Sequence, residues 1–357
     1  MKRLFLPLLL LLAACATTPP PRARELRGVW VATVNNLDWP SRRDLSPQEQ
    51  QGELVAIFDR AKALGLNAIF LQVRPMADAF YPSAIEPWSE FLGPVPPYDP
   101  LAFAIAEAHA RGLELHAWFN PFRGHAPAAN AYQYGKFVWM DPGDDAIQKQ
   151  SLDVVADVVR RYAIDGVHMD DYFYPYPEKD PSTSLGASLE FPDAPTYERY
   201  RGEGGRLSRD DWRRDNINRF VRELYRTVKS IRPAVEVGIS PFGIWRPHHP
   251  QQIEGFDAYD RIYADSKLWL ERGWVDYLAP QLYWAIDKKE QSFPVLMRWW
   301  VEHDRRRVGI VAGMSINRHP PEEIARQIAI VRREGGEGFI LFSARKLYTL
   351  PLESLSP

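Results

Sequence analysis

Cysteine is nearly absent from this chain, because Cys15 is the single one among 357 residues. A disulfide framework is therefore excluded, and a chain without further thiols suits an oxidising compartment. Basic runs are absent too: 44 Lys and Arg stand against 46 Asp and Glu, a formal net charge of −2, so nothing recommends a nucleic-acid partner. The sequence lacks a Gly-Xaa-Ser-Xaa-Gly segment, which argues against a serine hydrolase. His248-His249 stands beside proline without companion ligands, so we expect no metal and no other cofactor.

Aromatic residues and proline are abundant instead, with 12 Trp, 16 Tyr and 31 Pro. The remaining composition, 45% hydrophobic and 25% charged, is that of a globular protein with a sizeable core. We therefore expect elaborate loops around a binding cleft, although core packing also accounts for many rings.

The N-terminus has the pattern of an export signal. Lys2 and Arg3 precede the apolar run Leu4–Leu12, which at about nine residues is too short to span a membrane. Ala13-Ala14-Cys15 resembles the lipobox of bacterial lipoproteins, whose cysteine becomes the acylated first residue; the alternative is an ordinary signal peptide with an incidental cysteine. Ala16 lacks the Asp that marks inner-membrane retention, so we expect a periplasm-facing lipid anchor at Cys15 in the outer membrane. The predicted organisation is a signal peptide over 1–14, a lipidated tether over 15–24, one domain over 25–350 and a tail over 351–357.

Strand-like apolar runs alternate with amphipathic helical stretches from residue 27 onward. The expected strands are Gly28–Val34, Ala68–Val73, Leu113–Phe119, Gly166–Asp170, Val235–Ile239, Val275–Gln281, Val308–Ala312 and Gly338–Phe342. The expected helices are Gln48–Leu64, Leu101–Arg111, Ala146–Tyr162, Arg209–Ile231, Tyr259–Arg272, Pro294–Arg305 and Glu322–Arg333. Eight strands with helices between them predict an α/β fold of the (β/α)8 TIM-barrel type, with a doubly wound open sheet as the rival.

Connection lengths favour the barrel. Helices return to strands through one to three residues, whereas strands lead into helices through long loops such as Arg74–Pro100 and Asn120–Asp145. Tyr172–Ser208 is the longest of these loops and has no clear apolar period, so we expect it to form a cleft wall or lid. This asymmetry is typical of a barrel whose long loops gather at the C-terminal face, where barrel active sites lie.

Asp165–Pro175 is the stretch around which the other signals are arranged. It predicts a short strand that ends in two carboxylates, Asp170 and Asp171, and runs into Tyr172 and further aromatics. Carboxylates can supply acid–base or nucleophilic chemistry for glycosidic bonds, and aromatic faces can stack on sugar rings. Alternatively, the acidic pair caps a helix or forms an Asx-turn.

Polar side chains recur on one face of several expected strands. Period-2 alternation puts these inward-facing groups near the mouth of the barrel: Gln72, Arg74, His116, Trp118, Asn120, His168, Gln281 and Tyr283. His116 and His168 are either hydrogen-bonded interior residues or proton carriers, and Gln72 and Gln281 could satisfy one another. Arg74 near a barrel mouth requires a carboxylate or an anionic ligand, and it could keep Asp170 ionised.

Loop aromatics add candidate sugar platforms, of which we expect about half to line the cleft. These residues are Trp39, Tyr81, Trp88, Trp245 and Trp284.

The assembled blocks resemble the bacterial glycosyl-hydrolase-like barrel lipoproteins over almost the whole mature length. They are Arg27–Val34, Asp38-Trp39-Pro40, Gln72–Pro75, Asp78–Ser83, His116–Pro121, Asp165–Pro175, Ser240–Gly243 and Gln281–Trp284. The resemblance implies a TIM barrel in the cell envelope that hydrolyses glycan, with peptidoglycan strands stripped of stem peptides as the suggested substrate. Gly166–Asp170 is also similar to the fourth-strand segment of α-amylase-like barrels, where the last Asp is the nucleophile. The next strand here runs into Ser240-Pro241 without a Glu, so the amylase acid/base assignment does not transfer.

We therefore expect a glycoside hydrolase for a β-1,4-linked, N-acetylated glycan, with Asp170 as the leading catalytic carboxylate. Asp171 is its partner or an orienting group, and it reaches the same bond only if the strand breaks there. Asp78 and Glu86 are alternative second carboxylates, and substrate-assisted chemistry is open as well. The alternatives are a non-catalytic glycan-binding lipoprotein and a hydrolase of another N-acetylated or extracellular polysaccharide. A barrel hydrolase of another class, such as a metal-dependent deacetylase, is a further alternative. The sequence identifies no protein partner.

Overall fold

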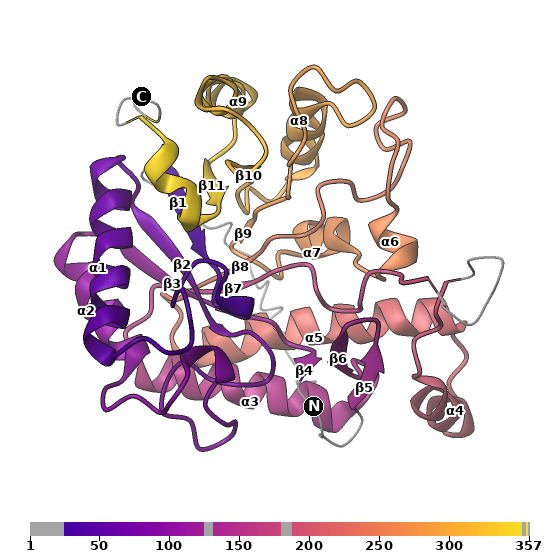
Figure 1. Cartoon of the computed structure of the whole chain (residues 1–357). Coiled ribbons are helices and arrows are strands. Elements are labelled where there is room, and N and C mark those ends of the chain that lie inside the picture. Colours follow the sequence, from indigo (N-terminus) through magenta and orange to yellow (C-terminus); the bar gives the residue numbers. More distant parts are fainter. Residues whose placement is uncertain (1–24, 125–130, 180–187, 352–354, 356–357) are drawn as a thin grey trace, which may run out of the picture.

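The computed structural model describes residues 25–124, 131–179, 188–351 and 355, and its centre is an eight-stranded parallel sheet (Figure 1). The eight strands are β1 (Leu26–Val31), β2 (Ala68–Arg74), β3 (Glu114–Phe119), β7 (Gly166–Met169), β8 (Glu236–Ile239), β9 (Tyr277–Leu278), β10 (Val311–Ser315) and β11 (Gly338–Phe342). They follow the order β10-β11-β1-β2-β3-β7-β8-β9. Parallel bridges from Leu278 to Ile310 and from Gln281 to Gly313 join the two ends of this order. The predicted (β/α)8 barrel is therefore confirmed.

Helices surround the sheet and connect its strands. They are α1 (Pro47–Ala63), α2 (Pro100–Ala110), α3 (Asp145–Arg161), α4 (Ala194–Gly202), α5 (Arg209–Ile231), α6 (Ala258–Arg261), α7 (Ser266–Arg272), α8 (Phe293–His303) and α9 (Pro321–Glu334), with short 3-10 turns η1 (Val34–Asn36), η2 (Glu90–Leu92) and η3 (Ala344–Thr349). The sequence marks several of their ends. Ser46 and Glu49 form a capping box at α1, the Asp99 carboxylate caps α2, and Gly335 ends α9 in the left-handed region.

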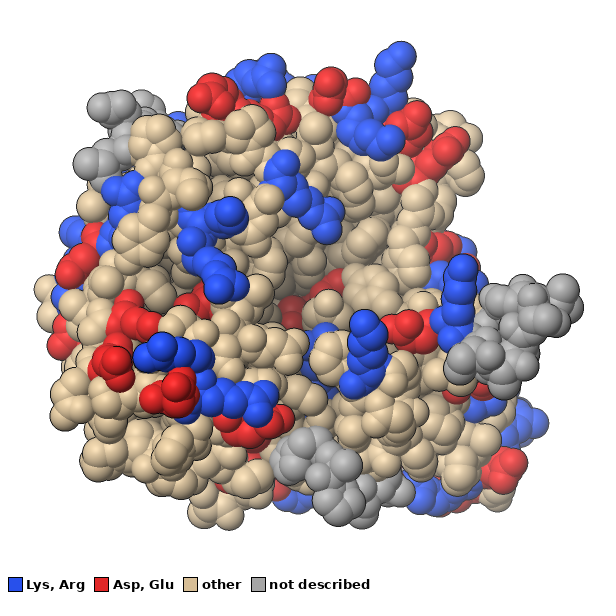
Figure 2. All heavy atoms as spheres, viewed as in Figure 1, with Lys and Arg blue, Asp and Glu red and all other residues tan. Residues whose placement is uncertain are grey.

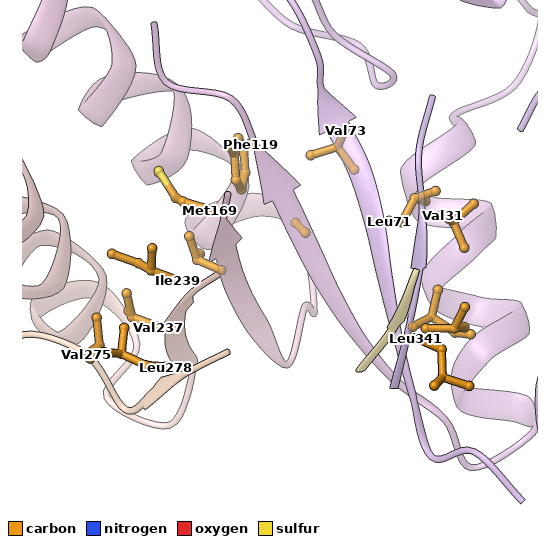
Figure 3. Packing of buried hydrophobic residues seen from close by; sticks show 14 of the residues in the cluster. Val31, Leu71, Val73, Phe119, Met169, Val237, Ile239, Val275, Leu278 and Leu341 are labelled. Carbon is orange, nitrogen blue, oxygen red and sulfur yellow. The ribbon is translucent and has the colours of Figure 1, made fainter. Parts of the chain in front are cut away.

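Strand alternation sorts the apolar side chains into two sets. One set, including Val31, Leu71, Phe119 and Met169, lies between the strands and the helices (Figure 3). The second set fills the barrel itself and comprises Leu26, Trp30, Ala32, Ala68, Phe70, Trp118, Tyr277, Ala279, Val311 and Ile340. Ala117 and Phe119 lie on the helix side, and the predicted inward position of Trp118 is confirmed.

Glycine makes room for rings inside the barrel. A Cβ on Gly238 would lie 1.8 Å from Cζ of Tyr277 on the neighbouring strand, and a Cβ on Gly166 would lie 2.0 Å from Nδ1 of His116. The rings of Tyr277 and His116 therefore occupy the space that side chains at these two positions would take. Such layers make the barrel interior a packed core rather than a channel.

The structure corrects several element boundaries. β10 begins at Val311 and extends to Ser315, three residues beyond the predicted Val308–Ala312 at its C-terminal end. The single helix predicted over Tyr259–Arg272 is two helices, α6 and α7, separated around Tyr263, whose φ is +57°. The loop 172–208 contains α4, which the sequence analysis did not predict.

The loop after β3 holds a second sheet that the sequence analysis did not predict. Its strands are β4 (Arg123–Gly124), β5 (Ala131–Tyr134) and β6 (Phe137–Met140), paired antiparallel in the order β4-β6-β5. This sheet stands beside the long loops that leave the carboxyl ends of the barrel strands (Figure 1). The long strand-to-helix loops predicted for that face are confirmed.

Across the described ranges, no helix combines the length and the apolar character that crossing a membrane would require.

Candidate active site

A cavity of about 460 Å³ opens at the carboxyl ends of the barrel strands. Its lining is Trp30, Ala32, Val34, Asn35, Leu37, Gln72, Trp118, Asn120, Arg123, Phe137, Asp170, Asp171, Tyr172, Tyr176, Ser240, Phe242, Gln281, Tyr283, Trp284, Arg318 and Phe342. Figure 2 shows a hollow near the middle of this face, with acidic atoms inside it and Lys and Arg side chains beside its edge. The cavity therefore joins carboxylates, amides and aromatic rings, which is the composition of a polar-ligand site.

Both members of the acidic pair reach the cavity. β7 ends at Met169, so Asp170 and Asp171 lie past the end of the strand, where side chains no longer alternate between faces. The peptide N–H of Phe173 donates to the Asp171 carbonyl at 3.0 Å, which turns the chain here. The condition set by the sequence analysis, that the strand must break for Asp171 to join Asp170, is met.

Asp170 has a buried carboxyl group that accepts two hydrogen bonds. Trp118 Nε1 donates to Oδ2 at 3.2 Å, and the Tyr172 peptide N–H donates to Oδ1 at 3.2 Å. Burial disfavours the charged form, and the neighbouring Asp171 adds like-charge repulsion, so together they raise the pKa of Asp170 to about 7. The Asx-turn that the sequence analysis offered as an alternative is thus present, but it involves only Oδ1 of the Asp170 carboxyl group. A carboxyl group with a pKa raised this far can hold a proton near neutral pH.

Asp171 is also buried, and different groups hold it. The Tyr176 hydroxyl donates to Oδ2, and the side-chain amide of Gln281 donates as well. Burial raises the pKa of Asp171, while these two donors oppose the rise because they favour the carboxylate form. The two acids therefore sit in unequal environments, and Asp171 has the stronger support as an anion.

Arg123 is the cation that acts on this pair. Its charge lowers the pKa of both Asp170 and Asp171. The guanidinium carbon lies 4.1 Å from the ring centre of Tyr172, in the loop after β7, and 4.5 Å from that of Phe137 on β6, so two aromatic rings flank it.

Arg74 does not take the role proposed for it. It is buried away from the cavity lining and forms a bidentate pair with Glu86, with Nε–Oε2 at 2.8 Å and Nη2–Oε1 at 2.5 Å. The register of β2 against β3 shifts between Gln72 and Arg74, so period-2 alternation fails at this position. The expectation that Arg74 keeps Asp170 ionised was wrong, and Glu86, the partner of Arg74, is no second carboxylate at the cavity.

Gln72 and Asn120 form an oriented amide pair in the cavity wall. The peptide N–H groups of Thr33 and Val34 both donate to Gln72 Oε1 at 2.9 Å, which leaves Nε2 to donate to Asn120 Oδ1 at 3.2 Å. Asn120 Nδ2 is buried and has no hydrogen-bond partner within the described part of the chain. It therefore offers a fixed donor to a ligand. The suggested Gln72–Gln281 pairing is not present, since Gln281 bonds to Ser240 and Asp171.

The two histidines lie below the cavity lining in the barrel interior. Trp30 Nε1 donates to His168 Nε2 at 3.0 Å, and His168 Nδ1 is 3.0 Å from the Tyr277 hydroxyl, which also contacts His116 Nδ1 at 3.2 Å. Burial lowers the pKa of His168 well below its ordinary value, so the ring is neutral. Of the two alternatives raised for these residues, the geometry supports interior hydrogen-bonded residues.

Of the five predicted loop platforms only Trp284 lines the cavity, so the expectation that about half of them would do so was too high. The other aromatic rings of the lining that the sequence analysis named are Trp118, Tyr172 and Tyr283. The following residues lie outside the lining: Trp39, whose Nε1 donates to Gln50 O at 2.8 Å; Tyr81, packed edge-on against Tyr162; Trp88, bridged to Ala79; and Trp245, whose Nε1 donates to Asp265 Oδ1 at 3.0 Å.

Asp78 also lies outside the lining. Its Oδ1 accepts the Met76 peptide N–H at 2.8 Å, which is a local turn contact. This placement does not support Asp78 as a second catalytic carboxylate. Cys15 falls outside the described residues, as do the whole predicted signal peptide and the whole predicted tether.

Sequence reasoning missed several lining residues. Tyr176 lies just beyond the stretch 165–175, Arg123 lies just beyond the block that ended at Pro121, and Arg318 follows a strand that was predicted to end too early. Extending the first two segments to the next polar residue would have found Tyr176 and Arg123, whereas Arg318 lies six residues beyond the predicted strand end. Trp30 was within a quoted block, and its inward position follows from the alternation of β1.

The described ranges contain no cluster of three or more His, Cys, Asp or Glu side chains arranged to bind a metal ion.

Two curated relatives align with most of this chain. Glycosyl hydrolase YngK of Bacillus subtilis (strain 168) is 41% identical, over 92% of this chain and 70% of its own length. Glycosyl hydrolase DigH of Escherichia coli (strain K12) is 38% identical, over 78% of this chain and 70% of its own length. The family model described as glycosyl hydrolase-like 10 matches residues 25–329.

Solved structures of glycoside hydrolases share the fold. The glycoside hydrolase domain of PgaB (BpsB) from Bordetella bronchiseptica superposes with a TM-score of 0.61 at 16% identity, covering 93% of this chain and 98% of that one. The catalytic domain of β-amylase from Paenibacillus polymyxa gives a TM-score of 0.60 at 11% identity, covering 93% and 96%. At these identities the likeness concerns the barrel alone.

Proposed function

Because this chain belongs to the glycosyl hydrolase-like 10 family, we propose that it is a glycosidase that cleaves the glycan strands of peptidoglycan, at sites that carry no stem peptides. The family membership and the glycoside hydrolase names of its relatives support the reaction class. The choice of peptidoglycan rests on the sequence resemblance and on the envelope location that the N-terminus predicts.

The unequal acid pair carries the proposal. Hydrolysis of a glycosidic bond needs a group that can protonate the leaving oxygen near neutral pH. Asp170, with its pKa raised to about 7 by burial, can hold that proton, while Asp171 accepts hydrogen bonds that favour its anion. Two carboxyl groups whose environments push them toward different protonation states are the usual basis for acid and base roles.

A substrate-assisted reaction suits two adjacent carboxyl groups and an N-acetylated sugar. The acetamido oxygen attacks the anomeric carbon of its own ring, the bond from that carbon to the leaving oxygen breaks, and Asp170 transfers its proton to that oxygen. Asp171 accepts the acetamide N–H and so orients the attacking oxygen. The attack closes a ring that joins the acetamido oxygen to the anomeric carbon. Water then adds to this carbon and opens that ring, and one proton of the water returns to Asp170, which restores the site.

The neutral lining completes the binding surface. Trp118, Tyr172 and Trp284 supply faces on which sugar rings stack, and Asn120 Nδ2 supplies a fixed donor for a sugar oxygen. The positions of these groups around Asp170 support polymer binding across the cavity.

The predicted lipid anchor at Cys15 would hold the enzyme at the outer membrane, facing the periplasm. Peptidoglycan lies within reach of such an anchor. The anchor is a proposal that labelling of Cys15 with a radioactive fatty acid in growing cells would test, with Cys15→Ala as the control.

Product analysis tests the proposed activity. Purified wild type and Asp170→Asn are incubated with intact peptidoglycan and with peptidoglycan whose stem peptides an amidase has removed, and soluble fragments are identified by mass spectrometry. We expect fragments from the stripped strands with wild type and a loss of about 10²- to 10⁴-fold in the variant, since that is the contribution of a general acid. Asp153→Asn, an exposed change on α3, is the matched control and should leave release unchanged.

Two other outcomes are informative. Binding of strands without release by any of these proteins would overturn the glycosidase proposal and leave a non-catalytic glycan-binding lipoprotein. Release of acetate without shorter strands would indicate the deacetylase class instead.

A further inference from the structure

Arg318 occupies a fixed position at the edge of the cavity. It lies in the loop between β10 and α9, where its peptide N–H donates to the Ser315 carbonyl at 3.3 Å. The ring Nε2 of the next residue, His319, is 3.1 Å from the Tyr283 carbonyl oxygen. These contacts tie the loop to the segment that follows β9, so the backbone at Arg318 is held beside the lining residue Tyr283.

The side chain of Arg318 is exposed and available. Its guanidinium carbon lies 5.8 Å from the centre of the Tyr283 ring. Within the described part of the chain, the guanidinium makes neither an ion pair nor a hydrogen bond to another residue. By contrast, the buried guanidinium groups of Arg74 and Arg213 each donate to carboxylates and to other protein oxygens. A guanidinium has five N–H donors in a planar fork that matches a carboxylate.

The Tyr283 phenol is acted on by this cation and by the acid pair. Burial and the charges of Asp171 and Asp170 raise the pKa of Tyr283 well above its ordinary value, and Arg318 acts on the same phenol in the opposite direction. The charges of Asp170, Asp171 and Arg318 therefore all affect the pKa of Tyr283. A sugar bound over the acids would bring its substituents toward Arg318.

In a glycan of alternating N-acetylated sugars, one of the two sugars can carry a lactyl ether. The carboxylate of this ether is then the anionic substituent of the repeat. That carboxyl group is free only when no peptide is attached, because a stem peptide converts it into a neutral amide and adds bulk. A cation at the rim therefore distinguishes stripped strands from peptide-bearing strands by charge as well as by size.

We propose that Arg318 binds the free lactyl carboxylate of the substrate and so makes the enzyme selective for strands that have lost their peptides. This inference rests on the proposed function and names the contact that would read the substrate.

The test compares carboxylate and amide forms of one glycan. Stripped strands are used as they are, or after their carboxyl groups have been coupled to methylamine. We expect amidation to lower kcat/KM of the wild type by about 10- to 100-fold, the range of a charge-assisted hydrogen bond. Arg318→Gln should lose a similar factor on the carboxylate form, through KM rather than kcat, and change little on the amide form.

Two further variants separate charge at this site from net charge. Arg318→Lys keeps the positive charge without the planar fork and should restore part of the loss. Arg298→Gln removes an exposed arginine on α8 that pairs with Glu334, outside the cavity lining, and should behave as wild type. Thermal unfolding verifies that each variant is folded.

Binding is measured separately from turnover by calorimetry with the two glycan forms and Asp170→Asn protein, with and without Arg318→Gln. If the Arg318 change weakens both forms equally, or if wild type does not distinguish them, the inference is overturned. If no glycan is cleaved but the carboxylate form still binds more tightly through Arg318, the proposed activity fails and the carboxylate site stands.

Discussion

At the scale of single residues, the protonation of Asp170 sets the expected pH dependence. A general acid must be protonated, and the pKa of Asp170 is raised to about 7 by burial. We therefore expect kcat/KM to fall about tenfold per pH unit above that pKa. Trp118 Nε1 donates to the Asp170 carboxylate and lowers its pKa, so Trp118→Phe should move this descending limb upward by about one unit.

The measurement is kcat/KM on stripped strands from pH 5 to pH 9 for both proteins. The position of the limb is the readout, since the loss of the indole also affects sugar stacking and thus the height of the curve. A rise of activity through pH 7 would instead identify Asp170 as an acting anion, such as a nucleophile. An unmoved limb in Trp118→Phe would mean that another group sets it.

Inward-facing residues at or just past the ends of the barrel strands were mostly placed correctly from the sequence. Alternation put Gln72, Trp118, Asn120, Gln281 and Tyr283 on the inward face near the mouth, and all five line the cavity. Alternation failed at Arg74, where the strand register shifts.

Loop residues have no such period. Trp39, Tyr81 and Trp245 stand near strand ends in the sequence, yet their contacts turn them into the surrounding packing. Which way a loop side chain points depends on partners far away in the sequence, and no local pattern reports them.

At the scale of the strands, the interior layers predict a sharp contrast between two glycines. Gly238→Ala on β8 would place a methyl group 1.8 Å from the Tyr277 ring, whose hydroxyl is also bonded to two histidines and cannot move freely. We expect a loss of about 1–3 kcal/mol in the free energy of unfolding, or more. Gly52→Ala on α1, where the added Cβ meets nothing within 4 Å, should instead add about 0.5–1 kcal/mol.

Urea unfolding followed by circular dichroism measures both changes. Because the two substitutions are chemically identical, they are each other's control. Equal effects of the two would contradict the close ring packing described for the barrel interior.

The elements themselves were largely predictable, with errors where signals conflict. β11 matched its predicted bounds because Gly336 and Ser343 frame a clean apolar run. The hairpin β5–β6 was missed although Gly135, with φ at +58°, marks its turn. Its strands are only four residues each and lie within a loop, where helix and strand preferences are weak.

At the scale of the whole molecule, Asp38 links the first loop to the C-terminal segment. Its Oδ2 accepts the Ala32 peptide N–H at 2.8 Å, and its Oδ1 accepts the Ser343 hydroxyl at 2.7 Å and the Arg345 peptide N–H at 2.9 Å. Asp38→Asn replaces one of these acceptor oxygens with an NH2 group, so a buried donor loses its partner. We expect the free energy of unfolding to fall by about 1–3 kcal/mol.

Urea unfolding again provides the measurement. Asp44→Asn, an exposed change in the same loop, is the control and should be nearly neutral. If Asp38→Asn were as neutral as this control, the three hydrogen bonds at Asp38 would not contribute to holding the barrel closed.

The whole-molecule architecture followed from connection lengths rather than from any single element. Short returns and long outgoing loops identified the face that carries the cavity before any side chain was placed. The sequence did not reveal that Arg123 on β4, rather than Arg74, would be the cation beside the acid pair. Its position depends on how a loop folds back over the barrel.

The small sheet β4-β6-β5 can change in evolution separately from the barrel strands. It delivers Arg123 and Phe137 to the cavity, yet it lies entirely between β3 and α3 and contributes no strand to the barrel. Descendants of such a chain can lengthen or exchange this sheet and so reshape the cavity wall, while the acids that follow β7 and the layers beneath them stay as they are. Keeping Arg123 preserves the charge beside the acid pair, so the wall of the cavity can diverge faster than the acids.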